Sequence, residues 1–398
     1  MKCMRRKLIG FLKRHPWMLR KCWKAAEIAL RLCGLFVPIE QKKMLFSSFG
    51  GRSFDDSPKA LYDEICRNPK FSDWELVWAF VEPEKYSPCR GRTVKIDTPE
   101  FFLTLLMSKV WVSNSGMTRG IKLKRRGVIR VETWHGTPLK KIGGEENSNT
   151  IGGPKKHKGK KDARTIRCAQ SEFDCEIFQR IQHAEKSAYL ICDLPRNDAL
   201  LQFSVDDRKV IREALGIPQE KKVILYTPTY REYLLDENKD TYIAPPMDLL
   251  RWKKELGEEY VLLFRAHYAV TAALELEENE FVWDVSDYPR LNDLYSIADV
   301  MISDYSSTFF DYAILDRPML CFAYDLEEYE EKRGLYLDLA ETLPCPISRT
   351  EEELLALIKT MDWETFSERT REFHMRFAPH AGHASEAVVK EMEKRLGS

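Results

Sequence analysis

Along most of the chain after residue 40, short runs of apolar and β-branched residues alternate with longer amphipathic stretches. This alternation predicts strands and helices that follow one another in βαβ order. In the first half the predicted strands are 44–47, 75–80, 94–96, 110–113, 128–132 and 165–168. In the second half they are 223–226, 260–264, 281–285, 300–303 and 319–322. The pattern therefore predicts an α/β protein with two parallel-sheet units of similar size.

The length of 398 residues also favours two domains over one. We place the boundary near residues 195–204, so that the predicted domains are residues 41–200 and 201–398. Residues 1–40 precede them as a separate arm. Residues 143–161 are rich in glycine and lysine and have no apolar period, which predicts a loop.

The arm carries nine Lys and Arg residues between residues 1 and 24, and no acidic residue before Glu27. Its apolar residues, among them Trp17 and Trp23, recur at mostly helical intervals. Basic amphipathic helices with aromatic residues bind in membrane interfaces, where each Lys or Arg near anionic lipid contributes about 1 kcal/mol. The most apolar stretch, 28–37, is interrupted by an arginine and is too short to span a bilayer. We therefore expect peripheral attachment to a membrane surface; the alternative is a helix packed on the protein with its charges in solvent.

Charge and cysteine usage argue against other classes of protein. Lys plus Arg and Asp plus Glu both total 62, and this balance is not typical of a nucleic-acid-binding protein. The ten cysteines include no CxxC pair and no Cys/His cluster at zinc spacing, which favours reduced thiols in the cytoplasm. We predict no metal site from these residues.

Polar clusters follow four of the predicted strands, at 133–140, 227–231, 265–268 and 304–311. Ligands of open α/β sheets bind beyond the carboxyl ends of the strands, so these clusters are the candidate sites. In the last cluster, Asp304-Tyr305-Ser306-Ser307 lies where a strand turns into a helix. Backbone N–H groups and hydroxyls at such a turn can bind a diphosphate, but Asp304 or Ser306 could equally cap the helix.

Two histidines lie in these clusters. His135 stands between Trp134 and a Gly-Thr-Pro turn, and His267 follows Arg265 at a strand end. A histidine titrates near neutral pH, and it can accept a proton or donate to a phosphate oxygen. Both are therefore candidate functional residues, against the alternative that they are structural. The Arg-Asn-Asp turn at 196–198 could face the site or cap the helix that follows it.

Taken together and in order, these motifs resemble those of the CDP-glycerol glycerophosphotransferase family. They are WHGTPLKK at 134–141, PRND at 195–198, YTPTYR at 226–231, RAH at 265–267 and SDYSS at 303–307. The family's first strand and glycine turn are similar to SSFGG at 47–51, and its carboxyl-terminal signature is similar to 322–329 with 333–338. The resemblance covers residues 44–385.

The resemblance implies a GT-B architecture, in which two Rossmann-like domains face each other across a cleft and the second binds the nucleotide. It implies metal-independent chemistry without a cofactor, with His135 as the candidate base and His267 beside the diphosphate as a second catalytic residue. The residues implied to bind the nucleotide and its diphosphate are Thr229, Arg231, Arg265, Asp304, Ser306, Ser307 and Asp311. Candidates for the acceptor side or the cleft are Lys140, Arg196, Asn197 and Asp198.

The resemblance further implies transfer of glycerol phosphate from CDP-glycerol, with release of CMP, at the cytoplasmic face of the membrane. The implied acceptor is an undecaprenyl-diphosphate-linked saccharide or poly(glycerol phosphate), in the synthesis of teichoic acid or a related envelope polymer. CDP-ribitol or a nucleotide sugar on the same fold, and a non-catalytic envelope scaffold, are the alternatives. The family's polymerases commonly carry a large additional amino-terminal region, so a primase or a capsule enzyme is also consistent with the sequence. The sequence leaves open whether the chain forms a homo-oligomer.

Overall fold

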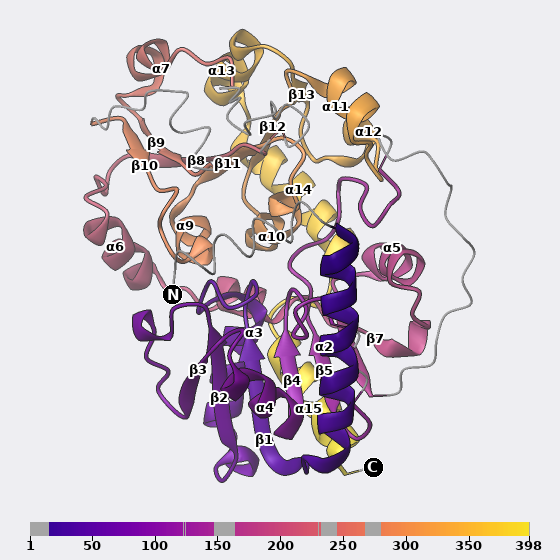
Figure 1. The fold of residues 1–398 in the computed structure, drawn as a ribbon. Coiled ribbons are helices and arrows are strands. Elements are labelled where there is room, and N and C mark those ends of the chain that lie inside the picture. Colours follow the sequence, from indigo (N-terminus) through magenta and orange to yellow (C-terminus); the bar gives the residue numbers. More distant parts are fainter. Residues whose placement is uncertain are drawn as a thin grey trace, which may run out of the picture. The chain divides into compact units, whose positions relative to one another are not determined.

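The structure is a computed structural model that describes residues 16–121, 123, 125–146, 164–229, 231, 245–266 and 280–397. The chain folds into two compact units (Figure 1). The first unit comprises Met1–Trp134, Ala163–Arg167 and Val388–Ser398, and the second comprises His135–Asp162 and Cys168–Ala387. Residues 168–200 thus belong to the second compact unit, whereas the predicted domain boundary at residue 200 assigns them to the first domain. That boundary stays a prediction.

The first sheet has seven strands within the described residues, in the order β3-β2-β1-β4-β5-β6-β7. The strands are β1 (Glu40–Ser47), β2 (Glu75–Phe80), β3 (Arg92–Lys95), β4 (Ser108–Ser113), β5 (Ile129–Glu132), β6 (Thr165–Ala169) and β7 (Tyr189–Ile191). The ladders from β3 to β6 are parallel. Strands that are covered on both faces need continuous apolar runs, and the buried run of Met44, Leu45 and Phe46 in β1 is of this kind.

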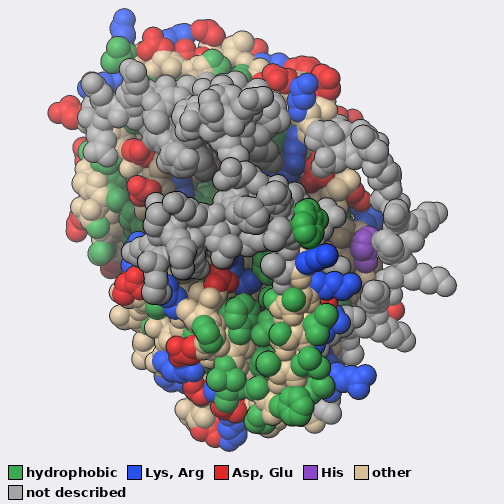
Figure 2. Space-filling model, viewed as in Figure 1, with side chains coloured by type: hydrophobic (Ala, Val, Ile, Leu, Met, Phe, Trp, Pro, Cys, Tyr) green, Lys and Arg blue, Asp and Glu red, His purple; other side chains and the backbone are tan. Residues whose placement is uncertain are grey.

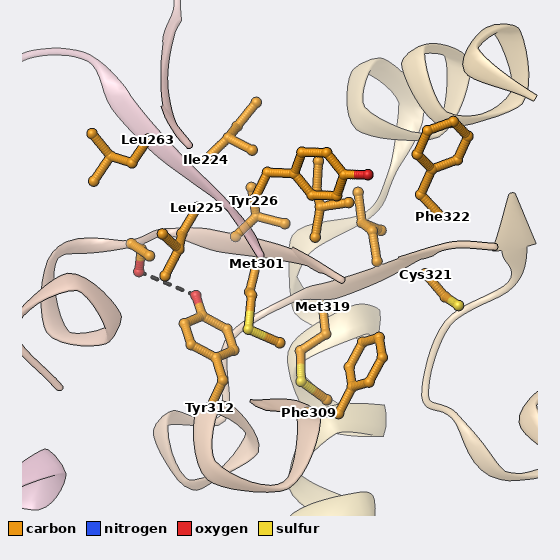
Figure 3. Packing of buried hydrophobic residues seen from close by; sticks show 14 of the residues in the cluster. Ile224, Leu225, Tyr226, Leu263, Met301, Phe309, Tyr312, Met319, Cys321 and Phe322 are labelled. Carbon is orange, nitrogen blue, oxygen red and sulfur yellow. Dashed lines mark hydrogen bonds between the residues drawn. The ribbon is translucent and has the colours of Figure 1, made fainter. Parts of the chain in front are cut away.

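The second sheet has six described strands in the order β10-β9-β8-β11-β12-β13, and its ladders are also parallel. They are β8 (Lys222–Thr227), β9 (Tyr260–Phe264), β10 (Val282–Asp284), β11 (Val300–Ser303), β12 (Met319–Phe322) and β13 (Ile347–Ser348). Figure 3 shows part of the core on this sheet, where Met301 and Met319 lie near Phe309 and Tyr312. The Tyr312 hydroxyl donates to the Ala298 carbonyl at 3.1 Å, so the buried phenol is satisfied.

The described α-helices are α2 (Pro16–Phe36), α3 (Asp56–Arg67), α4 (Pro99–Met107), α5 (Glu172–Gln182), α6 (Val205–Ala214), α7 (Leu249–Leu256), α9 (Leu291–Ile297), α10 (Thr308–Tyr312), α11 (Leu326–Lys332), α12 (Leu339–Thr342), α13 (Glu351–Thr360), α14 (Trp363–Phe377) and α15 (Ala384–Leu396). Short 3-10 turns are η1 (Pro69–Phe71), η2 (Pro83–Lys85), η4 (Lys186–Ala188), η5 (Pro195–Leu201) and η7 (Ala313–Leu315). Local sequence sets several starts. Thr98 accepts from the Phe101 N–H at 3.2 Å before α4, and Thr350 forms a capping box with Glu353 before α13.

Both sheets reverse their strand order at the first strand of the unit, between β1 and β4 and between β8 and β11. Ligands of doubly wound sheets bind beyond the carboxyl ends of the strands at such a reversal. In the second sheet these ends are Thr227 and Ser303, which the predicted motifs at 227–231 and 304–311 follow directly. The structure therefore confirms the predicted α/β class with two parallel sheets, and it places two of the predicted clusters at one sheet edge.

Helix α2 is the described part of the predicted arm. Its Leu30 packs against the core of the first unit, and the Arg125 guanidinium donates to the carbonyls of Leu106 and Val37 just beyond the helix. The large apolar side chains that are 45% to 85% exposed on α2 are Trp17, Trp23, Ile28, Leu32, Leu35 and Phe36. Figure 2 shows hydrophobic side chains gathered where Figure 1 draws α2, with Lys and Arg beside them. Within the described part of the chain, no helix has both the length and the apolar character to cross a membrane.

Candidate functional site

The loops after β8, β11 and β12 meet around the guanidinium of Arg231. Its Nε and Nη2 atoms donate to the two carboxylate oxygens of Asp325 at 2.7 and 2.8 Å, and Nη1 donates to Asp304 Oδ2 at 2.8 Å. The rings of Tyr305 and Tyr324 lie 4.8 and 5.2 Å from the guanidinium carbon. This planar fork, bound to two carboxylates and covered by aromatic rings, is an arrangement that lysine cannot reproduce.

Burial by itself lowers the pKa of Arg231, but Asp304 and Asp325 outweigh it and hold the pKa above its usual value. The Asp304 carboxylate is fully buried, and it also accepts the Thr229 N–H at 2.9 Å and the Tyr305 N–H at 2.7 Å. Asp304 therefore ties the loop after β8 to the loop after β11. The sequence prediction that Thr229, Arg231 and Asp304 share one site is consistent with this cluster; contact with a nucleotide stays a prediction.

The two serines at the end of β11 differ in what they contact. Ser306 Oγ accepts the Thr308 N–H at 3.2 Å, although Ser307 and not Ser306 is the residue that precedes α10. Ser307 is the residue before α10, and its side chain makes no cap hydrogen bond. Instead its Oγ faces the backbone of Gly136, where a Cβ would stand only 2.6 Å from that oxygen.

Gly136 brings the WHGTP motif into contact with the SDYSS motif. Its φ is +143°, a value that favours glycine, and Ser307 Cβ and Arg196 Nη2 would lie 2.9 and 3.5 Å from its Cβ. The close approach therefore needs a residue without a side chain. Trp134, two residues earlier, also has a left-handed φ of +59°, so the turn around His135 is set by its backbone.

Arg196 also contacts this turn. Its Nη1 donates to the His135 carbonyl at 3.0 Å, and its Nη2 donates to Asp311 Oδ2 at 2.5 Å. The ion pair is well covered, with the two side chains 14% and 3% exposed. Asn197 Nδ2 donates to the other oxygen of Asp311 at 3.0 Å. Arg196 therefore joins the His135 turn to Asp311, which lies 115 residues after Arg196 in the sequence.

A buried polar chain continues from Asn197. Its Nδ2 lies 3.2 Å from Asp193 Oδ1, which also accepts from Gln170 Nε2 at 2.7 Å. Gln170 Oε1 accepts from the Thr137 hydroxyl at 2.6 Å, which returns the chain to the WHGTP motif. Burial raises the pKa of Asp193 to about 8 although its hydrogen bonds lower it. Sequence reasoning missed Asp193 and Gln170, and it included Thr137 in the WHGTP motif without assigning it a role.

Several predicted site residues have structural partners. Lys140 forms an antiparallel bridge with Leu335, and the neighbouring Lys141 N–H donates to the Gly334 carbonyl at 2.9 Å. Asp198 accepts the Ala384 and Ser385 N–H groups at the start of α15. Arg265 Nη1 donates to the carbonyls of Tyr288 at 2.6 Å and Val285 at 3.2 Å.

His135 is half-buried, and its imidazole stays a predicted base. His267 lies outside the described residues, as does Tyr230 of the YTPTYR motif.

A family model described as CDP-glycerol:poly(glycerophosphate) glycerophosphotransferase matches residues 30–394. The chain belongs to this family. The teichoic acid poly(glycerol phosphate) polymerase of Staphylococcus epidermidis is 34% identical over 355 residues, which cover 85% of this chain and 48% of that protein. The teichoic acid glycerol-phosphate transferase of Staphylococcus aureus is 32% identical, with 88% and 92% covered. The chain thus spans about half the length of the first relative and most of the second.

Among solved structures, the wall teichoic acid polymerase TagF superposes with a TM-score of 0.82 at 29% identity, and the match covers 97% of each chain. Membership in the glycerophosphotransferase family confirms the resemblance read from the motifs. The WHGTP, PRND and SDYSS motifs, on which that resemblance rested, lie against one another at Gly136, Arg196 and Ser307.

Other concave and polar features lie elsewhere. A pocket of about 580 Å³ is lined by residues 340–346 and by Arg369, Glu372, Phe373 and Arg376 of α14, and it contains none of the predicted site residues. Across the residues that the structure describes, no group of three or more His, Cys, Asp or Glu side chains is placed to hold a metal ion. The family motifs, rather than the pocket, therefore define the candidate site of this chain.

At the first sheet's reversal, the glycine turn after β1 has left-handed residues at Phe49, Gly50 and Gly51. The Phe49 N–H donates to Asn114 Oδ1 at 2.8 Å, which links the ends of β1 and β4. A Cβ at Gly51 would lie 2.3 Å from Ile96 Cδ1 and 3.0 Å from the Ala79 carbonyl oxygen. Close packing thus requires this family glycine.

Proposed function

We propose that this chain transfers glycerol phosphate from CDP-glycerol to a hydroxyl of a lipid-linked saccharide or poly(glycerol phosphate) in teichoic acid synthesis, and releases CMP. The observation that supports it is the meeting of the His135–Gly136 turn, Arg196 and Asp311 beside Ser307 at the carboxyl end of β11. The relatives support it as well, because their names specify poly(glycerol phosphate) polymerase and glycerol-phosphate transferase, and one TagF structure is named with CDPG.

In the proposed reaction, the acceptor hydroxyl attacks the β-phosphorus of CDP-glycerol. A new oxygen–phosphorus bond forms, the bond from that phosphorus to the bridging oxygen breaks, and CMP leaves with the electron pair. His135 takes the hydroxyl proton. Since phosphoryl transfer depends mainly on positioning and on stabilising charge, a fixed turn at His135 is as important as the imidazole itself.

Within this proposal the predicted residues have two kinds of role. Ser306 and Ser307, with His267, bind the diphosphate, and Thr229 and Arg265 lie toward the nucleotide. Asp304 and Arg231 mainly hold their loops, because their side chains bind each other and Asp325. Arg196, Asn197 and Asp311 hold the His135 turn. Lys140 and Asp198 lie near the acceptor in this proposal. Each also anchors its own segment, because Lys140 pairs with Leu335 and Asp198 accepts the Ala384 N–H.

We also propose the GT-B arrangement, with an acceptor-side domain at residues 41–200 and a nucleotide-binding domain at 201–398. The two parallel sheets, each with the strand order of a Rossmann unit, support it. The proposed transfer uses no metal ion, because hydroxyl, imidazole and backbone N–H groups can neutralise the phosphates. Turnover that persists in excess EDTA is the expected result.

The decisive experiment incubates the purified chain with CDP-glycerol and a short undecaprenyl-diphosphate disaccharide analogue. The proposal predicts CMP release together with a product that is heavier by glycerol phosphate units. One added unit indicates a primase, and a ladder indicates a polymerase. A donor panel with CDP-ribitol and a nucleotide sugar tests the alternatives, since ribitol-phosphate enzymes are also among the relatives. A scaffold without activity would release no CMP from any donor.

For the membrane, we propose that α2 binds the cytoplasmic membrane surface peripherally. The exposed apolar side chains of α2, with Lys21 and Lys24 exposed on the same helix, support this proposal. Amphipathic helices of this kind bury their apolar face at the lipid headgroup boundary. Attachment there would bring the chain to the membrane that holds its lipid-linked acceptor.

A further inference from the structure

The two carboxyl groups behind the His135 turn are unequal. Asp311 accepts from Arg196 and Asn197, one on each oxygen. Asp193 receives all its described donors on Oδ1, from Gln170 Nε2, the Leu194 N–H and Asn197 Nδ2. Its Oδ2 is buried and has no hydrogen-bond partner among the described residues. Asn197 Nδ2 therefore joins an ion-paired carboxylate to a carboxyl group with one unsatisfied oxygen.

Asp193 is also fully buried, and its φ of +69° lies in the left-handed region, which aspartate adopts more readily than most residues. Buried polar residues are retained where the surrounding structure uses them. Here the use is visible, since Asp193 contacts Gln170 and Asn197, each of which leads back to the His135 segment through Thr137 or Asp311.

We propose that Asp193 is a positioning residue: through Asn197 it fixes Asp311, and through Asp311 it fixes the Arg196 side chain that holds the His135–Gly136 turn. The inference rests on the proposed function, because it assigns Asp193 to the geometry of that reaction. Asp193 does not touch the reacting atoms. Its contribution is to keep the acceptor of Arg196 in place, so its loss changes turnover more than substrate binding.

The same geometry sets the protonation state that this role needs. An ionised Asp193 would leave a charged oxygen unpaired in the interior, beside the carboxylate of Asp311. A proton on Oδ2 removes that charge and makes Oδ2 a hydrogen-bond donor. Asn197 Oδ1 is a buried acceptor of the same cluster that has no described partner, so it can accept from this proton. Asp193 is therefore neutral at pH 7, in agreement with its raised pKa of about 8.

The titratable and charged groups around Asp193 come from several elements. They are Asp311 of α10, Arg196 and Asp198 of η5, Cys192 beside it, Cys168 of β6, and Asp174 of α5, which shares Gln170. Burial raises the pKa of Asp174 to about 6, and hydrogen bonding to Cys168 keeps the pKa of the Cys192 thiol above its usual range. Arg196 is the permanent cation of this set, and Asp311 neutralises it. Ionisation of Asp193 above pH 8 would add a charge that nothing in this set balances.

Two variants test the inference in the CMP-release assay. Asp193→Asn keeps an acceptor and a donor, resembles the protonated acid and tolerates a left-handed φ, so kcat at pH 7 should stay within about threefold of wild type. Asp193→Gly keeps the backbone but leaves Gln170 and Asn197 short of an acceptor, so kcat should fall at least about fivefold, with KM for CDP-glycerol little changed. Normal kcat in Asp193→Gly overturns the inference.

The pH profile gives a readout that a merely structural residue would not move. Wild-type kcat should fall as the pH rises through 8, whereas Asp193→Asn should keep its rate there. An identical alkaline decline in both proteins overturns the inference. A wild-type chain that releases no CMP from CDP-glycerol instead refutes the proposed function.

Stability then tests Asp193 without activity. The pKa of the folded state is raised, so the proton stabilises the fold fully below about pH 4 and this stabilisation is lost as the pH rises toward 8. The Tm of wild type minus the Tm of Asp193→Asn should therefore decrease as the pH rises from about 4 toward 8. A Tm difference that does not change with pH overturns the protonation of Asp193.

Discussion

Gly136 lies against Ser307 so closely that a Cβ on the glycine would come within 2.6 Å of the serine Oγ. Gly136→Ala should therefore push the His135 turn away from the end of β11. We expect kcat/KM to fall by about two orders of magnitude, a loss that a misplacement of about 1 Å in an active site can cause. Steady-state CMP release measures the loss, and circular dichroism shows whether the chain is folded.

Gly216→Ala is the matched control for that substitution. Gly216 also has a left-handed φ, +70°, but a Cβ there meets nothing within 4 Å. The control carries backbone strain of about 1 kcal/mol without a steric clash. Equal losses of activity in the two variants would mean that general destabilisation, and not the contact with Ser307, explains the effect.

The covered ion pair between Arg196 and Asp311 should show strong coupling. Arg196→Met or Asp311→Asn leaves one buried charge unpaired, and each should lower the free energy of unfolding by about 3–5 kcal/mol. The double variant should cost less than the sum of the two. Urea unfolding of the four proteins gives the coupling energy.

An exposed ion pair serves as the control for this coupling. Arg92 and Glu100 are joined at 2.9 Å with side chains 41% and 63% exposed, so a double-mutant cycle on them should give a coupling energy of at most about 1 kcal/mol. Simple additivity at Arg196 and Asp311 would show that this pair does not hold the site together.

Arg231→Lys separates the two roles that the sequence and the structure suggest for this residue. A lysine cannot bind Asp304 and both oxygens of Asp325 at once, so the variant should lose about 2–3 kcal/mol of stability. Urea unfolding and the KM for CDP-glycerol are measured together. Unchanged stability with a KM raised tenfold would instead support direct contact with the nucleotide.

His135→Ala tests the proposed base. The variant should lose about 10²- to 10⁴-fold in kcat while its unfolding transition stays near that of wild type. His383→Ala is the control, because this side chain is 86% exposed and lies outside the cluster at Asp311. Near-normal turnover in His135→Ala would refute the assignment of His135 as the base. It would not bear on the position of the His135–Gly136 turn, which Arg196 contacts through the backbone carbonyl.

The inner strands were predictable because their apolar runs are continuous and covered on both faces. All eleven predicted strands are present, including 44–47 within β1 and 300–303 as β11. The sequence analysis missed β7 and β13, which stand at the ends of the two sheets and have two or three residues each. An edge strand of that length has no run long enough to recognise, and its pairing depends on its neighbours.

The candidate site was predictable only in part. Strand-end motifs identified His135, Arg196, Ser307 and Asp311, but no spacing shows that Arg196 binds Asp311 across 115 residues. Asp193 was missed because a single aspartate before a Leu-Pro pair has no recognisable signature. Its left-handed φ and its buried oxygen are properties of the folded chain, and only the structure shows them.

Helix α2 should bind anionic membranes through its exposed apolar face. Flotation of the full chain with vesicles that contain phosphatidylglycerol measures this, and neutral phosphatidylcholine vesicles should retain less protein, since each Lys near an anionic surface adds about 1 kcal/mol. Changing Ile28, Leu32 and Leu35 to Ser removes side chains that would each contribute about 1.5–3 kcal/mol when buried, so binding should be lost. Val210→Ser, an equally exposed apolar site on α6, should bind as wild type does. If the triple variant floats as well as wild type, α2 is not the membrane-binding element, and its apolar side chains must be covered by protein instead.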